Sequence, residues 1–223
     1  MATAPIRPLP RGPHSLTRDE VLASQRGRMI EAMAETVAAK GYAATTVADV
    51  VARAGVSRKT FYEHFGDREE CFLAAYDAAV DALLGAVTER VAAGEPAGDD
   101  WRARVRAGVR AYLDALASEP AFARTFLVEV RVAGPRAQAR RAEVHARFVD
   151  FLRSQARLAR QDHPWLPAVP DAVYAAIVGG MDEVVSAWVA DGRTADLAQL
   201  EPDLSYFQLA LLAGPEIAKE ALA

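Results

Sequence analysis

Residues 45–72 read TTVADVVARAGVSRKTFYEHFGDREECF and predict two short helices joined by a tight turn, followed by the start of a third helix. The apolar residues of the first helix recur at i, i+3, i+4 and i+7, which places on one helical face Val47, Val50, Val51 and Ala54. Gly55 suits the positive φ of a helix C-terminus, and Ser57 can cap the helix that follows. Phe61 and Phe65, four residues apart, give the second helix its buried side.

Polar and basic side chains remain on the outer face of the second short helix, namely Arg58, Lys59, Thr60, Tyr62 and His64. A short helix that is anchored on one side and carries hydrogen-bond donors on the other suits the major groove of DNA. The alternative is that these residues are only the solvated face of a small helical domain.

This stretch resembles the DNA-binding region of the TetR family of bacterial transcriptional regulators, over residues 18–75. The resemblance is carried by Thr46, the turn Ala54-Gly55-Val56-Ser57, Tyr62, His64-Phe65, Arg68 and Glu69-Glu70. Val51 stands where the family more often has alanine, and Arg68 where it more often has lysine. Both changes are physically tolerable, because the valine fills more core and the arginine keeps the charge.

The resemblance implies double-stranded DNA with a palindromic operator as a partner. Arg58, Lys59 and Thr60 then lie at the DNA-facing start of the recognition helix, where a base-edge or phosphate contact is expected. Tyr62, His64 and the Thr46 hydroxyl are expected to bind phosphates, with Arg68 as a further phosphate candidate. With the cap included, the expected DNA-binding residues are Thr46, Ser57, Arg58, Lys59, Thr60, Tyr62, His64 and Arg68.

Charge is distributed unevenly along the chain, whose net formal charge is −4. Residues 1–66 hold nine Lys/Arg and six Asp/Glu, an excess of +3, so the remaining residues carry −7. The acidic excess therefore lies away from the expected DNA-binding head, which supports a local contact surface.

The remaining sequence predicts helices throughout and an all-α fold, in which a three-helix helix-turn-helix head is joined to a larger helical bundle for ligand binding and dimerisation. Residues 1–17 are rich in proline and are expected to form a disordered arm, in which Arg7 and Arg11 could reach a minor groove or have no partner. We expect a DNA-binding domain over 18–67 and an effector-binding and dimerisation domain over 68–223. Proline and glycine positions predict helices at about 18–40, 67–93, 99–118, 120–132, 135–161, 170–191 and 202–221.

Composition argues against several other classes of protein. We expect no membrane span, because no apolar stretch approaches the ~20 residues that one needs, and the N-terminus lacks an apolar signal core, so a cytoplasmic location is the default expectation. One cysteine, Cys71, excludes an internal disulfide framework, and the four scattered histidines have no metal-binding spacing. We therefore expect no metal, no cofactor and no catalytic residues, and a buried side chain for Cys71 rather than a redox-sensing thiol.

The family typically binds a small effector among the helices of the body, and the resemblance implies the same here. The candidate pocket residues are Trp101, Tyr112, Phe122, Phe126, Glu129, Phe148, Phe151 and Met181. Each apolar member could equally be ordinary core. Glu129, in an otherwise apolar stretch, could bind a cationic ligand group, but pairing with Arg124, Arg131 or Arg136 is the preferred interpretation.

Two late apolar stripes predict a dimer surface, formed by Val173, Ile177, Gly180, Val184, Trp188, Leu204, Phe207 and Leu211. In the resembled family the last two long helices of each subunit form a four-helix interface. The alternative is that both stripes pack only within one chain.

The preferred interpretation is a homodimeric repressor that is released from its operator by a small, largely apolar molecule. The alternatives are a regulator without a ligand, an activator, an adaptor that has lost DNA binding, and a helical enzyme acting on an apolar substrate. The enzyme is disfavoured because no nucleophile–base pair or metal spacing is present.

Overall fold

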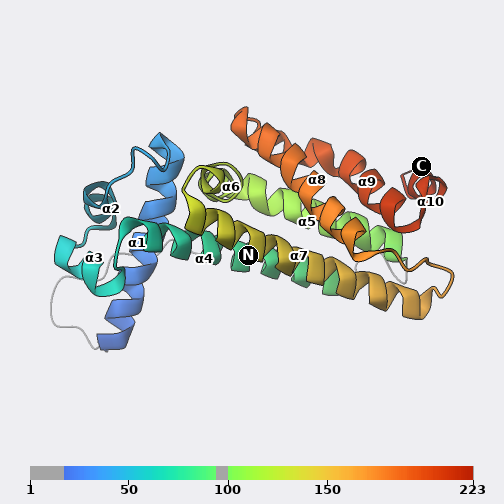
Figure 1. Ribbon diagram of the computed structural model, residues 1–223, viewed down its shortest axis with the longest axis horizontal. Coiled ribbons are helices and arrows are strands. Elements are labelled where there is room, and N and C mark those ends of the chain that lie inside the picture. The colour runs from blue at the N-terminus through green and yellow to red at the C-terminus, as the bar shows by residue number, and fades with distance from the viewer. Residues whose placement is uncertain (1–17, 94–99, 223) are drawn as a thin grey trace.

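The computed structural model describes residues 18–93 and 100–222, and within them every regular element is a helix (Figure 1). The head consists of α1 (Arg18–Lys40), α2 (Val47–Ala54) and α3 (Arg58–His64). The body contains α4 (Arg68–Ala92), α5 (Trp101–Ser118), α6 (Pro120–Leu127), η1 (Glu129–Arg131), α7 (Pro135–Asp162), α8 (Asp171–Ala190), η2 (Thr194–Leu200), α9 (Glu201–Ala213) and α10 (Pro215–Glu220). The all-α prediction with a helix-turn-helix head is confirmed. The expected arm over 1–17 lies outside the described residues.

Local signals fix the geometry of the helix-turn-helix. Thr46 caps α2 in a capping box, in which its hydroxyl accepts a hydrogen bond from the Asp49 amide and the Asp49 carboxylate accepts one from the Thr46 amide. Gly55 ends α2 in the left-handed region at φ 64°, where a side chain would be strained. Ser57 then caps α3 by accepting from the Thr60 amide at 3.0 Å.

Head and body share one hydrophobic cluster. It includes Met33 of α1, Phe61 of α3, Phe72 of α4 and Leu127 of α6, each fully or almost fully buried. The helix α4 leads from the head into the body, where it contacts both α5 and α7 (Figure 1). Head and body are therefore joined by continuous side-chain packing.

Two predicted helices are interrupted. The helix expected over 120–132 ends at Leu127, and the chain continues as the 3₁₀ segment η1, in which Glu129 is buried. The helix expected over 202–221 ends at Gly214, which has φ 100° and leads into the short α10. In the second case, the glycine conformation ends the helix although apolar periodicity continues past it.

The expectation that no apolar stretch reaches the length of a membrane span was wrong. The helices α4 and α8 are long and apolar enough by length and composition alone. Core helices of bundles meet the same criterion, and α4 packs against α1, α5, α6 and α7. Only 33% of the apolar window of α8 is buried within the chain, which leaves part of this helix uncovered.

Candidate nucleic-acid interface and ligand cavity

The outer face of α3 is open to solvent. Ser57, Arg58, Lys59 and Tyr62 are exposed, and Tyr62 retains 50% of its accessible surface although its ring packs edge-on against Phe61. The opposite face is anchored, because Phe61 and Phe65 are buried. The start of α3 is therefore a protruding helix N-terminus that carries donors and a positive helix dipole.

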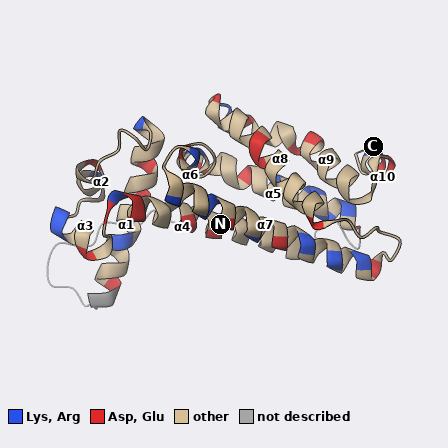
Figure 2. Cartoon of the chain, viewed as in Figure 1, with Lys and Arg blue, Asp and Glu red and all other residues tan. Residues whose placement is uncertain are grey.

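The cations of α3 differ in their pairing from Lys40 of α1 and Arg53 of α2. Lys40 binds Asp49 at 2.6 Å and Arg53 binds Glu35 at 2.7 Å. Arg58 takes part in no ion pair within the described parts of the chain, and Lys59 has only a long 3.8 Å contact with Glu63. Figure 2 shows basic residues at the end of α3 that points away from the body. Two available positive charges thus lie where a phosphate or a guanine edge would approach.

The remaining expected DNA contacts are less open. Thr46 is exposed, but its hydroxyl donates to Asp49 at 2.5 Å and is already part of the cap. Thr60 is half-buried and holds a 2.9 Å hydroxyl contact with Ser57. The Nε2 atom of the half-buried His64 is itself buried and has no hydrogen-bond partner among the described residues, so the side chain must turn before this nitrogen can reach a phosphate.

Arg68 lies in a different environment from the other expected DNA contacts. Its guanidinium stacks on the Tyr42 ring at 4.2 Å and donates to the carbonyl oxygens of Tyr42, at 3.1 Å, and of Thr45. The side chain therefore ties the start of α4 to the turn between α1 and α2.

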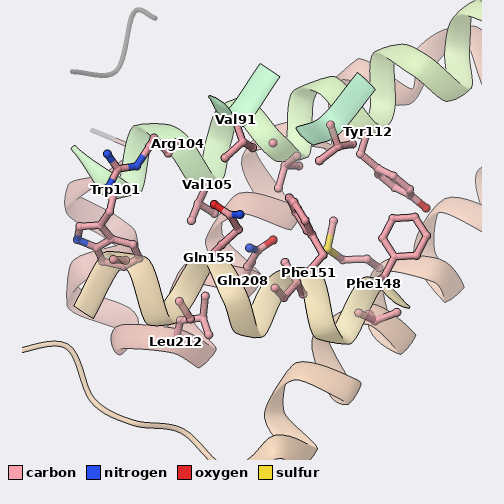
Figure 3. Close-up of a pocket in the computed structure, with 18 of the residues that line it drawn as sticks. Val91, Trp101, Arg104, Val105, Tyr112, Phe148, Phe151, Gln155, Gln208 and Leu212 are labelled. Carbon is pink, nitrogen blue, oxygen red and sulfur yellow. The ribbon is translucent and has the colours of Figure 1, made fainter. Parts of the chain in front are cut away.

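The body encloses an elongated cavity between α4, α5, α7, α8 and α9 (Figure 3). Six of the eight predicted pocket residues line it, namely Trp101, Tyr112, Phe126, Phe148, Phe151 and Met181. From Trp101 to Tyr112 it extends ~16 Å along α5, at ~1.5 Å per residue. Its free volume is about 130 Å³, similar to apolar cavities of ~150 Å³ that hold one benzene ring. A longer ligand must therefore displace side chains or helices.

Sequence reasoning missed the polar residues of this cavity. Arg104 and Arg160 lie in the wall at the end formed by Trp101 and Leu166, where Pro167 is exposed. Gln155 and Gln208 lie in the middle (Figure 3). Asp182, which also lines the cavity, is close enough to Tyr112 to influence it electrostatically, and His145 contacts Asp182 at 3.7 Å.

Phe122 and Glu129 lie outside the cavity. Phe122 is half-buried elsewhere in α6. Glu129 is 6% exposed and lies at the junction of head and body, where its carboxylate accepts from the Tyr42 amide at 2.8 Å and pairs with Arg124 at 3.4 Å. The preferred ion-pair interpretation of Glu129 thus agrees with the geometry, with Arg124 as its partner.

The same short segment, η1, also reaches the cavity wall. Arg131 donates to Asp182 at 2.7 Å, to Ser186 at 2.9 Å and to Glu183 at 2.8 Å, all on α8. Asp182 lines the cavity, whereas Glu129, two residues before Arg131, holds the turn after α1. One 3₁₀ turn thus connects the ligand cavity with the head.

Asp182 is ionised in spite of its burial. Burial alone would raise its pKa, but the interactions with His145 and Arg141 outweigh this effect and hold the pKa below its usual range. Arg131 and Arg141 both contact this carboxylate, so it forms the centre of a cluster of charges on α7, α8 and η1. A neutral side chain at this position would leave both arginines without their shared partner.

The predicted dimer stripe is only partly available to a second chain. Ile177 and Leu204 are buried within the chain, Trp188 is covered by Arg193 at 3.5 Å, and Gly180 lies against the Phe207 ring. Val173 is half-buried. Val184 and Leu211 remain exposed, and further small or apolar exposed residues of α8 and α9 include Ala172, Ala176, Ala187 and Tyr206. The uncovered part of α8 is thus rich in alanine.

Cys71 is fully buried, and burial raises the pKa of its thiol to about 12. Within residues 18–93 and 100–222 there is no group of three or more His, Cys, Asp or Glu residues that could hold a metal ion. Two arginines of α7 bridge to α4, since Arg140 binds Asp77 and Arg147 binds Asp81.

Comparison with known proteins gives a family for the head. Residues 29–75 match the model described as bacterial regulatory proteins, tetR family. The HTH-type transcriptional activator FasR of Mycolicibacterium smegmatis is 34% identical over 99 residues, which cover 44% of this chain and 42% of FasR. The match thus spans less than half the length of that curated relative.

Solved structures share the fold over most of the chain. The fatty acid degradation regulator FadR of Bacillus halodurans superposes with a TM-score of 0.72 at 20% identity, covering 84% of this chain and 94% of FadR. FadR of Bacillus subtilis, solved in complex with stearoyl-CoA, gives 0.71 at 19% identity, covering 84% and 98% of the two chains. At these identities the likeness establishes the fold.

Proposed function

Because the chain is a member of the TetR family of bacterial regulatory proteins, we propose that it is a homodimeric DNA-binding regulator whose affinity for a palindromic operator changes when an aliphatic ligand enters the body. The observation that carries this proposal is the exposed, cationic N-terminus of α3 on an anchored helix-turn-helix. The family and the relatives are transcriptional regulators and not enzymes.

DNA readout is assigned to the open face of α3. Arg58 is the candidate for a base edge, since it has no ion pair among the described residues, and Lys59 and Tyr62 are candidates for phosphates. Thr46, Ser57, Thr60 and His64 flank this face and complete the contact surface. Arg68 contributes by orienting the head on α4 through its bonds to Tyr42 and Thr45.

The ligand is proposed to be a long-chain acyl compound with an anionic end. The cavity is elongated and mainly apolar, and Arg104 and Arg160 supply positive charge at one end. The stearoyl-CoA complex of the FadR relative supports the same ligand class. Each methylene buried in the apolar part contributes about 0.8 kcal/mol, so affinity is expected to rise about fourfold per added CH₂ until the cavity is filled.

Coupling is proposed to pass through η1. A long ligand must widen the cavity, and a shift of α8 against α7 moves the carboxylate that holds Arg131. Glu129, on the same turn, then moves the Tyr42 amide and the α1–α2 junction. Only a ligand that binds one arrangement better than the other can shift the equilibrium in this way.

Dimerisation is proposed to use the uncovered faces of α8 and α9, with Val184 and Leu211 at the contact. Operator half-sites about 34–36 Å apart, or a multiple of this distance, would then meet the two heads. Repression is the preferred direction of regulation. Activation is the second candidate, because the FasR relative is named an activator.

The proposal is tested with fluorescence anisotropy of labelled DNA from upstream of the gene, across a salt series. Saturable binding that depends on sequence and weakens steeply with salt is the expected result. Equal, weak binding to random DNA would contradict DNA readout by α3. Reporter transcription with and without the gene then separates repression from activation.

A further inference from the structure

Two glutamine side chains interrupt the apolar middle of the cavity. Gln155 comes from α7 and Gln208 from α9, and Figure 3 shows both amides in the space between Trp101 and Arg104 at one end and Tyr112 and Phe148 at the other. Gln208 is only 6% exposed. Neither side-chain amide has a hydrogen-bond partner among the residues that the structure describes.

Gln155 is half-buried, and neither amide is among the buried polar atoms that lack a partner, so both still face the open space of the cavity. A ligand that fills this space cuts the amides off from water, which is costly unless the ligand supplies hydrogen bonds in return. Leucine or methionine at these positions would fill the same space without that cost. Two such amides at the same level of one cavity, on different helices, therefore indicate a partner that is supplied by the ligand.

The charges in the cavity restrict the chemistry of that partner. Arg104 and Arg160 lie at one end and the Asp182 cluster lies toward the other, so the charged lining residues that the structure describes lie away from the level of the glutamines. A carboxylate or phosphate would be bound better beside the arginines. Glutamine amides offer N–H donors and a carbonyl acceptor, which suit a neutral carbonyl.

We infer that Gln155 and Gln208 form a binding site for the neutral carbonyl of an acyl thioester, ester or amide. The inference rests on the proposed function, because it assigns a part of the proposed ligand site. The alkyl chain then extends from the glutamines toward Phe148 and Tyr112, over about 10 Å of α7 at ~1.5 Å per residue. The anionic portion extends toward Arg104 and Arg160, five residues from Gln155 along α7 in the case of Arg160.

The test compares two probes, lauroyl-CoA and the hydrocarbon dye diphenylhexatriene, on the full chain. The variants are Gln155→Met, Gln208→Met and the double variant, since methionine has a similar length and no amide. Gln161→Met is the matched control, because Gln161 is exposed on the same helix and does not line the cavity. Dissociation constants come from the fluorescence of the dye and of the protein's tryptophans.

Each single cavity variant is expected to lower the affinity for lauroyl-CoA about 3- to 10-fold, which is the effect of losing one net hydrogen bond. The double variant is expected to lower this affinity further. The variants are expected to bind diphenylhexatriene equally well or better, because the cavity becomes more apolar. Gln161→Met is expected to leave the dissociation constants of both probes unchanged. Thermal midpoints without ligand stay equal or rise, which excludes misfolding as the cause.

Unchanged lauroyl-CoA affinity in the double variant would overturn the inference, as would an equal loss for both probes. If the wild-type protein binds the dye but does not bind lauroyl-CoA, the inference is also overturned, although the cavity remains a ligand site. Failure of the wild type to bind either probe would instead contradict the proposed function itself.

Discussion

Replacing Glu129 with alanine removes the contact by which η1 holds the head. The buried Tyr42 amide, which donates to Glu129 at 2.8 Å, then loses its acceptor. Leaving a buried donor unsatisfied costs about 1–3 kcal/mol. Arg124 is 40% exposed and can turn to solvent, so the loss of its ion pair adds little.

A loss of about 2 kcal/mol lowers the thermal midpoint of a chain of this size by about 4–8 °C. Glu129→Gln keeps an oxygen acceptor for the Tyr42 amide and gives up the charge, so its midpoint is expected between wild type and Glu129→Ala. Glu183→Gln is the matched control, because Glu183 is 73% exposed and its pair with Arg131 contributes little.

Calorimetry gives the midpoints, and hydrogen exchange resolved to the Tyr42 amide gives the local effect. Glu129→Ala is expected to accelerate exchange at this amide more than at amides of α9. A wild-type midpoint together with unchanged Tyr42 exchange would refute the assignment of Glu129 as the link between body and head.

Three further predictions concern the head, the cavity wall and the core. Arg58→Ala is expected to lower the affinity for operator DNA about tenfold or more and to reduce the slope of log affinity against log salt concentration by about 1 per head. Arg153→Ala on α7 is the control and is expected to leave both quantities unchanged. Equal anisotropy curves for the two variants would contradict DNA readout by Arg58. Asp182 has a lowered pKa in the folded state, so its ionisation stabilises the protein above its unfolded pKa of ~3.9, and this stabilisation is lost as the pH falls through the folded value. Asp182→Asn is therefore expected to flatten the fall in stability below about pH 4, as measured by urea unfolding across pH; an unchanged acid limb would argue against ionised Asp182. Cys71, with a thiol pKa of about 12, is expected to resist iodoacetamide at pH 8 until the protein unfolds, and mass spectrometry that finds rapid alkylation of the native protein would show that the site opens.

The head could be predicted closely because its signals are local. Thr46, Gly55 and Ser57 act within one helical turn of their own positions, so spacing alone places them. Arg68 could not be assigned in this way, because its partners are carbonyl oxygens 26 and 23 residues earlier in the chain.

The cavity was predictable in its aromatic residues and less so in its polar ones. Phe148 and Phe151 stand out in the sequence as part of a helical stripe, and Gln155 lies on the same stripe, where its position alone suggests ordinary core. Its significance depends on Gln208, 53 residues later and on a different helix. The predicted dimer surface is only partly available to a second chain for a related reason. Periodicity identifies the apolar face of α8 but does not show whether α9 of the same chain covers that face.

The most direct test of coupling between the cavity and the head measures the affinity of lauroyl-CoA for the free protein and for the protein saturated with its operator. Linkage requires both affinities to differ by the factor by which lauroyl-CoA changes the affinity for DNA. We expect a difference of about 5- to 150-fold, the usual range of allosteric coupling, and a smaller one in Glu129→Gln. Equal affinities for free and operator-bound protein, with lauroyl-CoA bound in both, would contradict the account.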